Sequence, residues 1–245
     1  MTHKIKYRRV LIKLSGRALS GVGGFGFDGS VVASLAQQMG RVVKGGIEVA
    51  VVVGGGNILR GMAASAAGMN RVTADYAGML GTVINSLILQ DALEKEGVDA
   101  RIQSAVAIPA VVEPYVHRRA LHHLERGRVV ILAGGTGNPY LTTDTAAALR
   151  AIEVGAEVLL VGKYGVDGVY DVDPRKKAEA KRFDKISYAE ALRMRLEVMD
   201  STAFMLCMEN KLPIIVFDLH APNSIERVLS GEAIGTLVCE TGGSR

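Results

Sequence analysis

The fold is decided by residues 129–151, which read VVILAGGTGNPYLTTDTAAALRA. Val129–Ala133 is short and aliphatic and predicts a buried strand, and the small residues after Asp144 predict the start of a helix. In open α/β sheets, ligands bind beyond the carboxyl ends of the strands, and the free N–H groups at a helix start attract anions. The connecting loop, Thr136–Asp144, is therefore a candidate anion site. It equally fits a plain strand–turn–helix connection in which Thr143 or Asp144 caps the helix.

Apolar runs and helical patterns alternate along the whole chain. Val49–Val53 holds five aliphatic residues, the pattern of a strand that is buried on both faces. Further strands are predicted at 10–14, 100–104, 158–161, 214–217 and 236–239, and helices at 30–44, 73–96, 117–126, 144–154, 188–195, 200–210 and 223–230. This alternation predicts a mainly parallel sheet with helices on both of its faces. The charged stretch from Lys163 to Ser187 is irregular and is expected to form a separate lobe or a hairpin.

Composition narrows the class of protein. The 245 residues are 49% hydrophobic and include 29 glycines, which suits an α/β protein with buried strands and tight turns. The two cysteines, Cys207 and Cys239, give neither a disulfide framework nor a metal spacing, and they suit a reducing compartment. With no signal peptide and no apolar run of membrane-spanning length, we expect a soluble cytoplasmic protein without a membrane partner.

The net charge of +4 fits phosphate ligands. The basic residues at Arg175–Lys177 and Lys181–Arg182 are expected to lie on a solvated loop rather than on a nucleic-acid-binding surface. Nucleic acid is therefore an unlikely partner.

Three further loops follow predicted strands and belong to the same expected sheet edge. Lys13–Gly16 places a lysine at the end of a strand, either to meet a ligand or to extend its stem into solvent. Gly54–Asn57 contains three successive glycines that expose backbone N–H groups, as a phosphate cradle requires, and Arg60 adds a planar guanidinium. Val166–Pro174 is an acidic turn, and its Tyr170 suits contact with a flat base.

Common nucleotide-binding and catalytic motifs fail. Gly162-Lys163 lacks the upstream glycine and the following Ser or Thr of a P-loop. Gly24–Gly29 matches G-x-G-x-x-G but does not follow a strand directly, and Glu48 lies at the start of the next strand rather than at its end, which disfavours a dinucleotide fold. No Ser–His–Asp or Cys–His pairing is supported. Three histidines of a polar predicted helix are expected at its surface: His117, His122 and His123.

Five motifs, in order, resemble those of the bacterial uridylate (UMP) kinases of the amino-acid kinase superfamily, and the resemblance runs from about Arg9 to Glu240. They are KLSG at 13–16, GGGNILRG at 54–61, GMNRVTAD at 68–75, TGNPYLTTD at 136–144, and DGVY with the following Asp-Pro at 167–174. The resemblance implies a single three-layer α/β/α domain over 1–245 with about eight strands, an acceptor (UMP) side at roughly 1–155 and an ATP side at roughly 156–245. It implies transfer of the ATP γ-phosphoryl group to UMP in pyrimidine nucleotide biosynthesis. It also implies Mg²⁺, GTP as activator, UTP as inhibitor and a homohexamer.

The resemblance also assigns residues by matching position. The ATP contacts would be Lys13, Leu14, Ser15, Gly16, Gly56, Arg60, Tyr164, Tyr170 and Asp173. The UMP contacts would be Gly55, Asp75, Thr136, Gly137, Asn138, Pro139, Tyr140, Leu141, Thr142 and Thr143. The expected catalytic residues are Lys13, Arg60 and Asp144, with the two cations neutralising charge on the transferred group and the carboxylate orienting the lysine or the metal. The segment linked to GTP activation would be Gly21, Val22, Gly23, Gly24, Phe25 and Gly26. Mg²⁺ would arrive with ATP, and no protein ligand is assigned to it.

Departures from the family pattern leave alternatives open. Arg17 stands where relatives usually have an acid, which puts the GTP response in doubt and leaves open a nucleotide-sensing regulator without catalysis. The segment Gly162–Val169 is longer than in many relatives, which shifts the alignment at Tyr164. Asp200 replaces the lysine of superfamily members that phosphorylate carboxylates, or simply caps a helix. Asp75 either binds the ribose or complements the dipole of the helix that it opens. The apolar stripe of that helix is core, or in part a subunit interface.

Overall fold

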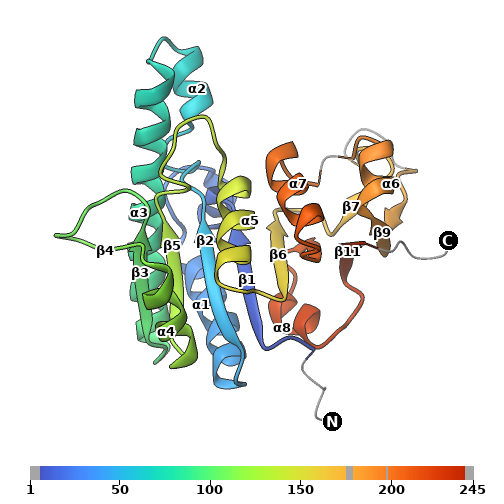
Figure 1. The fold of residues 1–245 in the computed structure, drawn as a ribbon, viewed down its shortest axis with the longest axis horizontal. Coiled ribbons are helices and arrows are strands. Elements are labelled where there is room, and N and C mark those ends of the chain that lie inside the picture. The colour runs from blue at the N-terminus through green and yellow to red at the C-terminus, as the bar shows by residue number, and fades with distance from the viewer. Residues whose placement is uncertain (1–5, 175–178, 197, 241–245) are drawn as a thin grey trace.

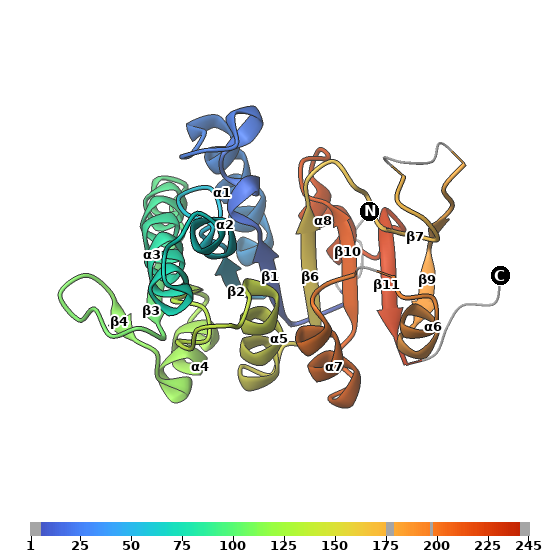
Figure 2. The same cartoon turned by 90° about the horizontal axis from the view of Figure 1, so that it is seen from above.

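The computed structural model describes residues 6–174, 179–196 and 198–240. They form a central sheet of nine strands with helices on both of its faces, which gives three layers (Figures 1 and 2). In sheet order the strands are β4 (Glu113–Pro114), β3 (Ala100–Ser104), β5 (Val129–Ala133), β2 (Glu48–Val53), β1 (Arg9–Leu14), β6 (Val158–Lys163), β10 (Ile214–Asp218), β11 (Gly235–Cys239) and β9 (Lys185–Ser187). Neighbouring strands are parallel, except β10 and β11. The predicted fold class is confirmed, with nine strands where about eight were expected.

The helices divide between the two faces, as Figure 2 shows. One face carries α1 (Gly29–Lys44), α3 (Arg71–Lys95) and α8 (Ser224–Leu229), and the other α4 (His117–Glu125), α5 (Thr143–Glu153), α6 (Tyr188–Arg193) and α7 (Ser201–Glu209). The short α2 (Gly61–Ala66) precedes α3, and two 3₁₀ turns, Gly16–Ala18 and Gly21–Gly23, follow β1. Successive side chains of a strand point to opposite faces, so Val10 and Ile12 pack on the α1 side and Leu11 on the α5 side. Each face thereby has its own apolar core.

The predicted strands and helices lie within two residues of the observed bounds at each end. The elements that the sequence pattern missed are α2, β4 and the short strands between 169 and 187. In that region β7 (Val169–Tyr170) and β8 (Arg182–Phe183) form an antiparallel hairpin, and β9 joins the edge of the main sheet. The hairpin expectation is confirmed for the described residues, whereas Arg175–Lys177 of the predicted basic loop lies outside them.

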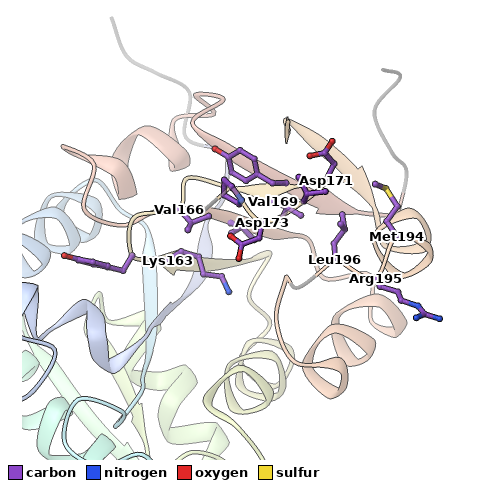
Figure 3. A pocket seen from close by; sticks show the side chains of 14 residues that line it. Lys163, Val166, Val169, Asp171, Asp173, Met194, Arg195 and Leu196 are labelled. Atoms are coloured by element: carbon purple, nitrogen blue, oxygen red, sulfur yellow. The ribbon is translucent and has the colours of Figure 1, made fainter. Parts of the chain in front are cut away.

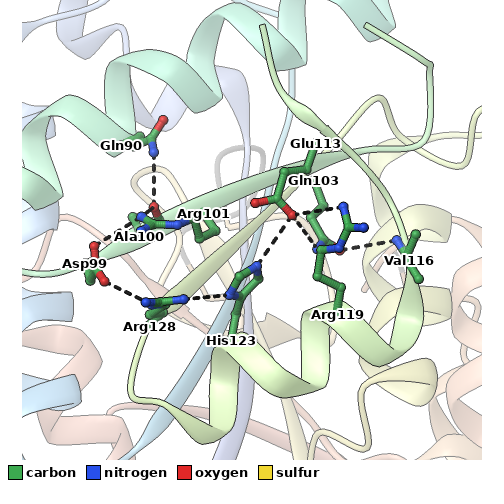
Figure 4. Close-up of polar contacts among 10 residues, drawn as sticks. All are labelled: Gln90, Asp99, Ala100, Arg101, Gln103, Glu113, Val116, Arg119, His123 and Arg128. Carbon is green, nitrogen blue, oxygen red and sulfur yellow. Dashed lines mark hydrogen bonds and ion pairs between the residues drawn. The ribbon is translucent and has the colours of Figure 1, made fainter. Parts of the chain in front are cut away.

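A polar cluster fixes the opposite edge of the sheet, at β3 and β4 (Figure 4). Glu113 Oε2 accepts a hydrogen bond from Gln103 Nε2 at 3.2 Å and lies 3.4 Å from His123 Nε2. Arg128 Nη1 lies 3.2 Å from His123 Nδ1, and since a guanidinium only donates, Nδ1 accepts and Nε2 carries the proton toward Glu113. His123 is 7% exposed, so the expectation of a surface histidine is wrong, because Glu113 on the edge strand supplies the carboxylate partner. His117 and His122 are exposed, as expected.

Helix α3 is, within the part of the chain that the structure describes, the one helix long and apolar enough to cross a membrane by length and composition. Its inner face buries the polar side chains of Thr82, Asn85 and Ser86 against the rest of the domain. Their hydrogen bonds are made inside the protein. Helix α3 is therefore a core helix of this fold.

Candidate active site

Four loops that carry predicted site residues meet at the carboxyl edge of the sheet. They follow β5, β2, β1 and β6, which are consecutive neighbours in the parallel part of the sheet. Leu14 at the end of β1 lies opposite Val53 on one side and Gly162 on the other. Parallel strands that end together place their following loops side by side, at the edge where ligands bind.

The loops after β1 and β2 touch each other through glycines. A Cβ on Gly16 would lie 2.4 Å from Asn57 Oδ1 and 2.7 Å from Gly56 N, so no larger residue fits. A Cβ on Gly54 would lie 3.0 Å from Gly16 N and 3.5 Å from Thr143 Oγ1. The first turn of α5 therefore joins the same contact, and three of the predicted segments form one continuous surface.

Lys13 and Asp144 form a largely buried ion pair at the centre of this surface. Lys13 Nζ lies 2.7 Å from Asp144 Oδ1, without the alignment of a hydrogen bond. Burial alone would raise the pKa of Asp144, but the positive charge of Lys13, helped by Lys163 and by a hydrogen bond from the backbone of Asp200, holds that pKa below its ordinary value. Asp144 is thus an anion at neutral pH that orients the ammonium of Lys13.

The start of α5 is held by Thr142 rather than by the predicted caps. Thr142 Oγ1 accepts hydrogen bonds from Asp144 N at 3.0 Å and Thr145 N at 3.3 Å, so the expected cap at Thr143 or Asp144 is wrong. The same hydroxyl donates to Asp200, whose other bonds come from Thr145 Oγ1 at 3.0 Å and Ala203 N at 2.9 Å. Asp200 is therefore the N-cap of α7, as one alternative predicted, and also joins α5 to α7.

Asp75 ties the loop after β5 to helix α3. Its Oδ2 accepts from Arg71 Nε at 2.8 Å and from Tyr140 N at 2.8 Å. Helix α3 begins at Arg71 and is capped by the Asn70 side chain, which accepts from the backbone N–H groups of the first turn. Asp75 lies beyond that turn, which removes the helix-dipole alternative because the dipole acts within the first turn. Its ribose contact stays a prediction.

The loop 136–141 itself stands open to solvent beside Asp144. Tyr140 is 65% exposed and has a φ of 69°, a conformation that non-glycine residues seldom adopt. The guanidinium of Arg71 lies 5.1 Å from the centroid of its ring. The loop is held after its start by Asp75 at Tyr140 and by Asp200 at Thr142, and before its start by the hydrogen bond from Gly134 N to Thr82 Oγ1 at 2.7 Å, while Asn138 and Tyr140 are exposed. The exposed residues of the loop are therefore accessible to a ligand from solvent.

A cavity of about 500 Å³ opens on the other side of Lys163 (Figure 3). Its lining includes the predicted contacts Tyr164, Tyr170 and Asp173 together with apolar side chains such as Val216. This volume is in the range of small-ligand sites, and mixed apolar and polar walls suit a base with a sugar. The cavity therefore brings the three residues predicted for the adenosine side together.

Tyr170 is held in the cavity wall by a chain of polar contacts. Its hydroxyl donates to Asp167 Oδ1 at 2.5 Å, and Arg182 Nη1 donates to Asp167 Oδ2 at 2.7 Å. Burial would raise the pKa of Asp167, but the hydrogen bond from Tyr170 and the charge of Arg182 hold it below its ordinary value. At the rim, Tyr164 meets His220 edge-on, with ring centroids 4.8 Å apart.

Two further cations lie near this surface, Arg60 and Lys163. Arg60 is exposed at the start of α2, and its Nε donates to Gly56 O at 3.2 Å, so it lies against the loop Gly54–Asn57, the glycine loop. Its phosphate contact stays a prediction. Lys163 was missed as a site residue. It ends β6 opposite Asp218, lines the cavity, and acts electrostatically on Asp144. Like Lys13, Lys163 is a lysine at the end of an apolar strand, which is the pattern that identified Lys13. The predicted strand ended at Val161, however, and so did not include Lys163.

The segment 21–26, predicted as an effector-linked region, packs against the glycine loop at Asn57. Gly24 and Gly26 have positive φ values of 70° and 67°, and Phe25 is 78% exposed. Both backbone groups of Gly26 bind Asn57, with Gly26 N donating to Asn57 O at 3.1 Å and Asn57 Nδ2 donating to Gly26 O at 2.5 Å. The segment contacts the site through Asn57.

Chemically, the assembled groups suit phosphates. The buried ammonium of Lys13, the glycine loop and the start of α5 share one surface between the exposed loop 136–141 and the cavity beside Lys163. Across the described ranges, no cluster of three His, Cys, Asp or Glu side chains could hold a metal ion. The arrangement places the fixed positive charge of Lys13 on the surface that joins these loops.

Comparison with known proteins places this geometry in a family. The model of the Amino acid kinase family matches residues 8–218. A crystal structure of UMP kinase from Bacillus anthracis is 41% identical, with 97% of this chain and 99% of that chain covered and a TM-score of 0.93. A UMP kinase from Ureaplasma parvum is 38% identical, with 96% and 100% covered and a TM-score of 0.91. A uridylate kinase from Archaeoglobus fulgidus is 27% identical, with 94% and 99% covered and a TM-score of 0.74.

Proposed function

The chain belongs to the amino acid kinase family, and we propose that it is a UMP kinase that transfers the γ-phosphoryl group of ATP to UMP, giving ADP and UDP. The observation that carries the proposal is the Lys13–Asp144 pair, at 2.7 Å, between the open loop 136–141 and the cavity beside Lys163. The similarity to solved UMP kinases over nearly the whole chain supports the choice of acceptor.

The chemistry needs positioning more than covalent help. Phosphoryl transfer requires the attacking and leaving oxygens in line and neutralisation of the charge that spreads over the transferred group. Lys13 supplies the fixed cation, and Asp144 holds that ammonium in place. The acceptor is a phosphate oxygen that is already anionic, so no strong base is needed. Arg60, which is exposed at the glycine loop, would reach the phosphates on ligand binding.

The donor substrate would be the ATP–Mg²⁺ complex. Mg²⁺ commonly keeps several water ligands and binds through substrate phosphates with one or two carboxylates, so it needs no protein cage. The residues of the site fit an ion that is carried by the substrate. Both carboxylate oxygens of Asp200 already accept hydrogen bonds from Thr142, Thr145 and Ala203, so Asp200 is not free to bind the metal. When bound, the ion would neutralise phosphate charge beside the lysines.

The two substrates would occupy the two halves of a single domain. Residues 1–155 would form the acceptor side, with UMP held by Gly55, Asp75 and the loop Thr136–Thr143. Residues 156–245 would form most of the donor side, with the adenosine held in the cavity by Tyr164, Tyr170 and Asp173, and the phosphates by Lys13–Gly16 and Gly56. The apolar and aromatic cavity lining supports the second assignment.

Assembly and regulation extend the proposal. Helix α3 exposes a stripe of apolar side chains that are each 38–47% exposed: Val72, Tyr76, Leu80, Ile84 and Leu87. Their spacing puts them on one side of the helix, which supports self-association, proposed to reach a homohexamer. We further propose GTP activation linked to the segment 21–26, inhibition by UTP, and a cytoplasmic role in pyrimidine nucleotide biosynthesis.

Initial rates with ATP and Mg²⁺ and with UMP, CMP or dUMP as acceptor test the proposed function. We expect UMP to have the highest kcat/KM by a clear margin, with one ADP formed for each UDP. Equal kcat/KM values for UMP and CMP would refute the acceptor assignment. Tight UMP binding without ADP release would instead make the chain a nucleotide sensor.

A further inference from the structure

Two buried asparagines connect the glycine loop to helix α3. Asn57 is 1% exposed and Asn85 is fully buried. Asn85 Nδ2 donates to Asn57 Oδ1 at 2.7 Å, and Asn57 Nδ2 donates back to Asn85 Oδ1 at 3.1 Å. The remaining N–H of each amide binds a backbone carbonyl, that of Asn85 at Gly54 O (2.7 Å) and that of Asn57 at Gly26 O (2.5 Å). All four side-chain N–H groups of the pair are thus hydrogen-bonded. Because Gly54 O and Gly26 O can only accept, each amide must turn its NH₂ group toward its carbonyl, which fixes the orientation of both side chains.

The amide pair contacts three segments that are distant in the sequence. Asn57 belongs to the glycine loop and also lies against Gly16, where a Cβ would come within 2.4 Å of its Oδ1. Asn85 belongs to α3, which packs on the same loop so closely that a Cβ on Gly55 would lie 2.4 Å from Gly78 O. Helix α3 is long and rigid, so it fixes Asn85, and Asn85 fixes Gly54 and Asn57.

The third segment, 20–27, projects from the domain. Its ends are joined by the hydrogen bond from Asp28 N to Leu19 O at 2.7 Å. Between these ends Phe25 and Phe27 are exposed. Inside the loop, Gly26 N–H donates to Asn57 O, and Gly26 O accepts a hydrogen bond from Asn57 Nδ2. A displacement of the segment 20–27 would therefore also displace Asn57, the residue that holds the shape of the glycine loop.

We propose that Asn57 and Asn85 are positioning residues: their amide pair holds the glycine loop in its phosphate-binding shape and transmits the position of the segment 20–27 to that loop. The role in turnover rests on the proposed phosphoryl transfer, whereas the mechanical coupling does not. A fully satisfied buried polar network is rigid and acts as a unit, so losing one member loosens the others. A displacement of about 1 Å at a phosphate loop is enough to reduce turnover by on the order of 100-fold.

The test compares Asn85→Ala and Asn57→Ala with the control Ser86→Ala. Ser86 is adjacent to Asn85 and equally buried, but its hydroxyl bonds to Thr82 O at 2.8 Å within the helix. Two measurements are made on the full-length protein: kcat and KM for ATP and UMP, and hydrogen–deuterium exchange of the amides of residues 20–27. A thermal melt of each variant accompanies them.

We expect both asparagine variants to lose roughly 10- to 100-fold in kcat with smaller changes in KM. Asn85→Ala should accelerate exchange in 20–27 although Asn85 makes its contact with that segment through Asn57. The double variant should be no worse than the poorer single variant, because the pair acts as one unit. Ser86→Ala should change kcat and exchange by less than about twofold.

Unchanged exchange in 20–27 for folded Asn85→Ala would overturn the coupling, and so would an equal effect of Ser86→Ala at matched loss of melting temperature. If Asn85→Ala does not fold, Asn57→Ala decides by the same two measurements. If the wild-type protein does not phosphorylate UMP, the proposed function fails, while the exchange measurement still decides the coupling.

Discussion

An ammonium group buried as deeply as that of Lys13 needs a compensating charge, and Asp144 supplies it at 2.7 Å. The sequence pointed to both residues separately, because a lysine at the end of an apolar strand is unusual and Asp144 is the lone negative charge of its loop. The family resemblance left open whether Asp144 orients Lys13 or a metal, and the residue pattern alone does not show the pairing, since it depends on β1 and α5 meeting across 131 positions of chain. Lys163 was missed because the predicted strand ended at Val161, whereas β6 continues to Lys163.

Replacing Lys163 by methionine should lower kcat by on the order of 10²-fold, the scale of one lost transition-state cation. It should also raise the pKa of Asp144, because Lys163 is one of the charges that keep that pKa low. The acid limb of the kcat profile, below which Asp144 is protonated, should therefore move to higher pH. The measurement is kcat from pH 4 to pH 9 for both proteins.

The exposed Lys181, on the hairpin, provides the matched control Lys181→Met, which should behave as wild type. An unchanged acid limb together with unchanged kcat in Lys163→Met would show that Lys163 has no part in the site.

At the scale of elements, strands and helices with a clear apolar period were predictable, whereas very short elements and elements without such a period were not. β4 has two residues, and α2 is a six-residue run of Gly, Ala, Met and Ser without a cap signal. The cap of α5 shows the other limit. Thr142, Thr143 and Asp144 are all good N-cap residues, and the contact of Thr142 with Asp200, far along the chain, selects among them.

The polar cluster around His123 and Glu113 predicts how the stability of the fold changes with pH. Burial would raise the pKa of Glu113, but hydrogen bonds from Gln103 and His123 and the charge of Arg119 bring it below its ordinary value. A carboxyl with a lowered folded-state pKa stabilises the fold above its unfolded pKa, and this contribution is lost as pH falls through the folded value. Glu113→Gln should therefore lose less stability than wild type between pH 5 and pH 3.

Urea unfolding midpoints at several pH values check this prediction, with Glu125→Gln on the exposed end of α4 as control. Parallel stability curves for wild type and Glu113→Gln would contradict the assignment of an ion-pairing role to Glu113.

At the scale of the whole molecule, alternation of strands and helices was enough to predict a parallel sheet and hence a shared edge for the loops. It was not enough to predict the strand order, which places β1 between β2 and β6 and thereby puts Lys13 between the two proposed substrate sites. From the sequence, the exposed side of α3 could be predicted only as an apolar stripe. The helical pattern does not show whether such a stripe packs against the core of the same chain or against another chain.

Self-association should depend on that side of α3. Ile84→Asp should reduce the mass measured by light scattering to that of a smaller species, because it places a charge in the apolar stripe. Leu192→Asp, at an exposed position on α6, is the control and should keep the wild-type mass. A monomeric wild-type protein would contradict the proposed assembly.

The central claim is that Lys13 stands between a donor and an acceptor nucleotide at the carboxyl edge of the sheet. The most direct test is the rate of UDP formation from ATP and UMP by wild type and by Lys13→Met, with folding checked by circular dichroism. We predict that wild type turns over and that the variant, still folded, loses about 10²- to 10³-fold in kcat. A folded Lys13→Met with wild-type turnover, or a wild type that forms no UDP, would contradict it.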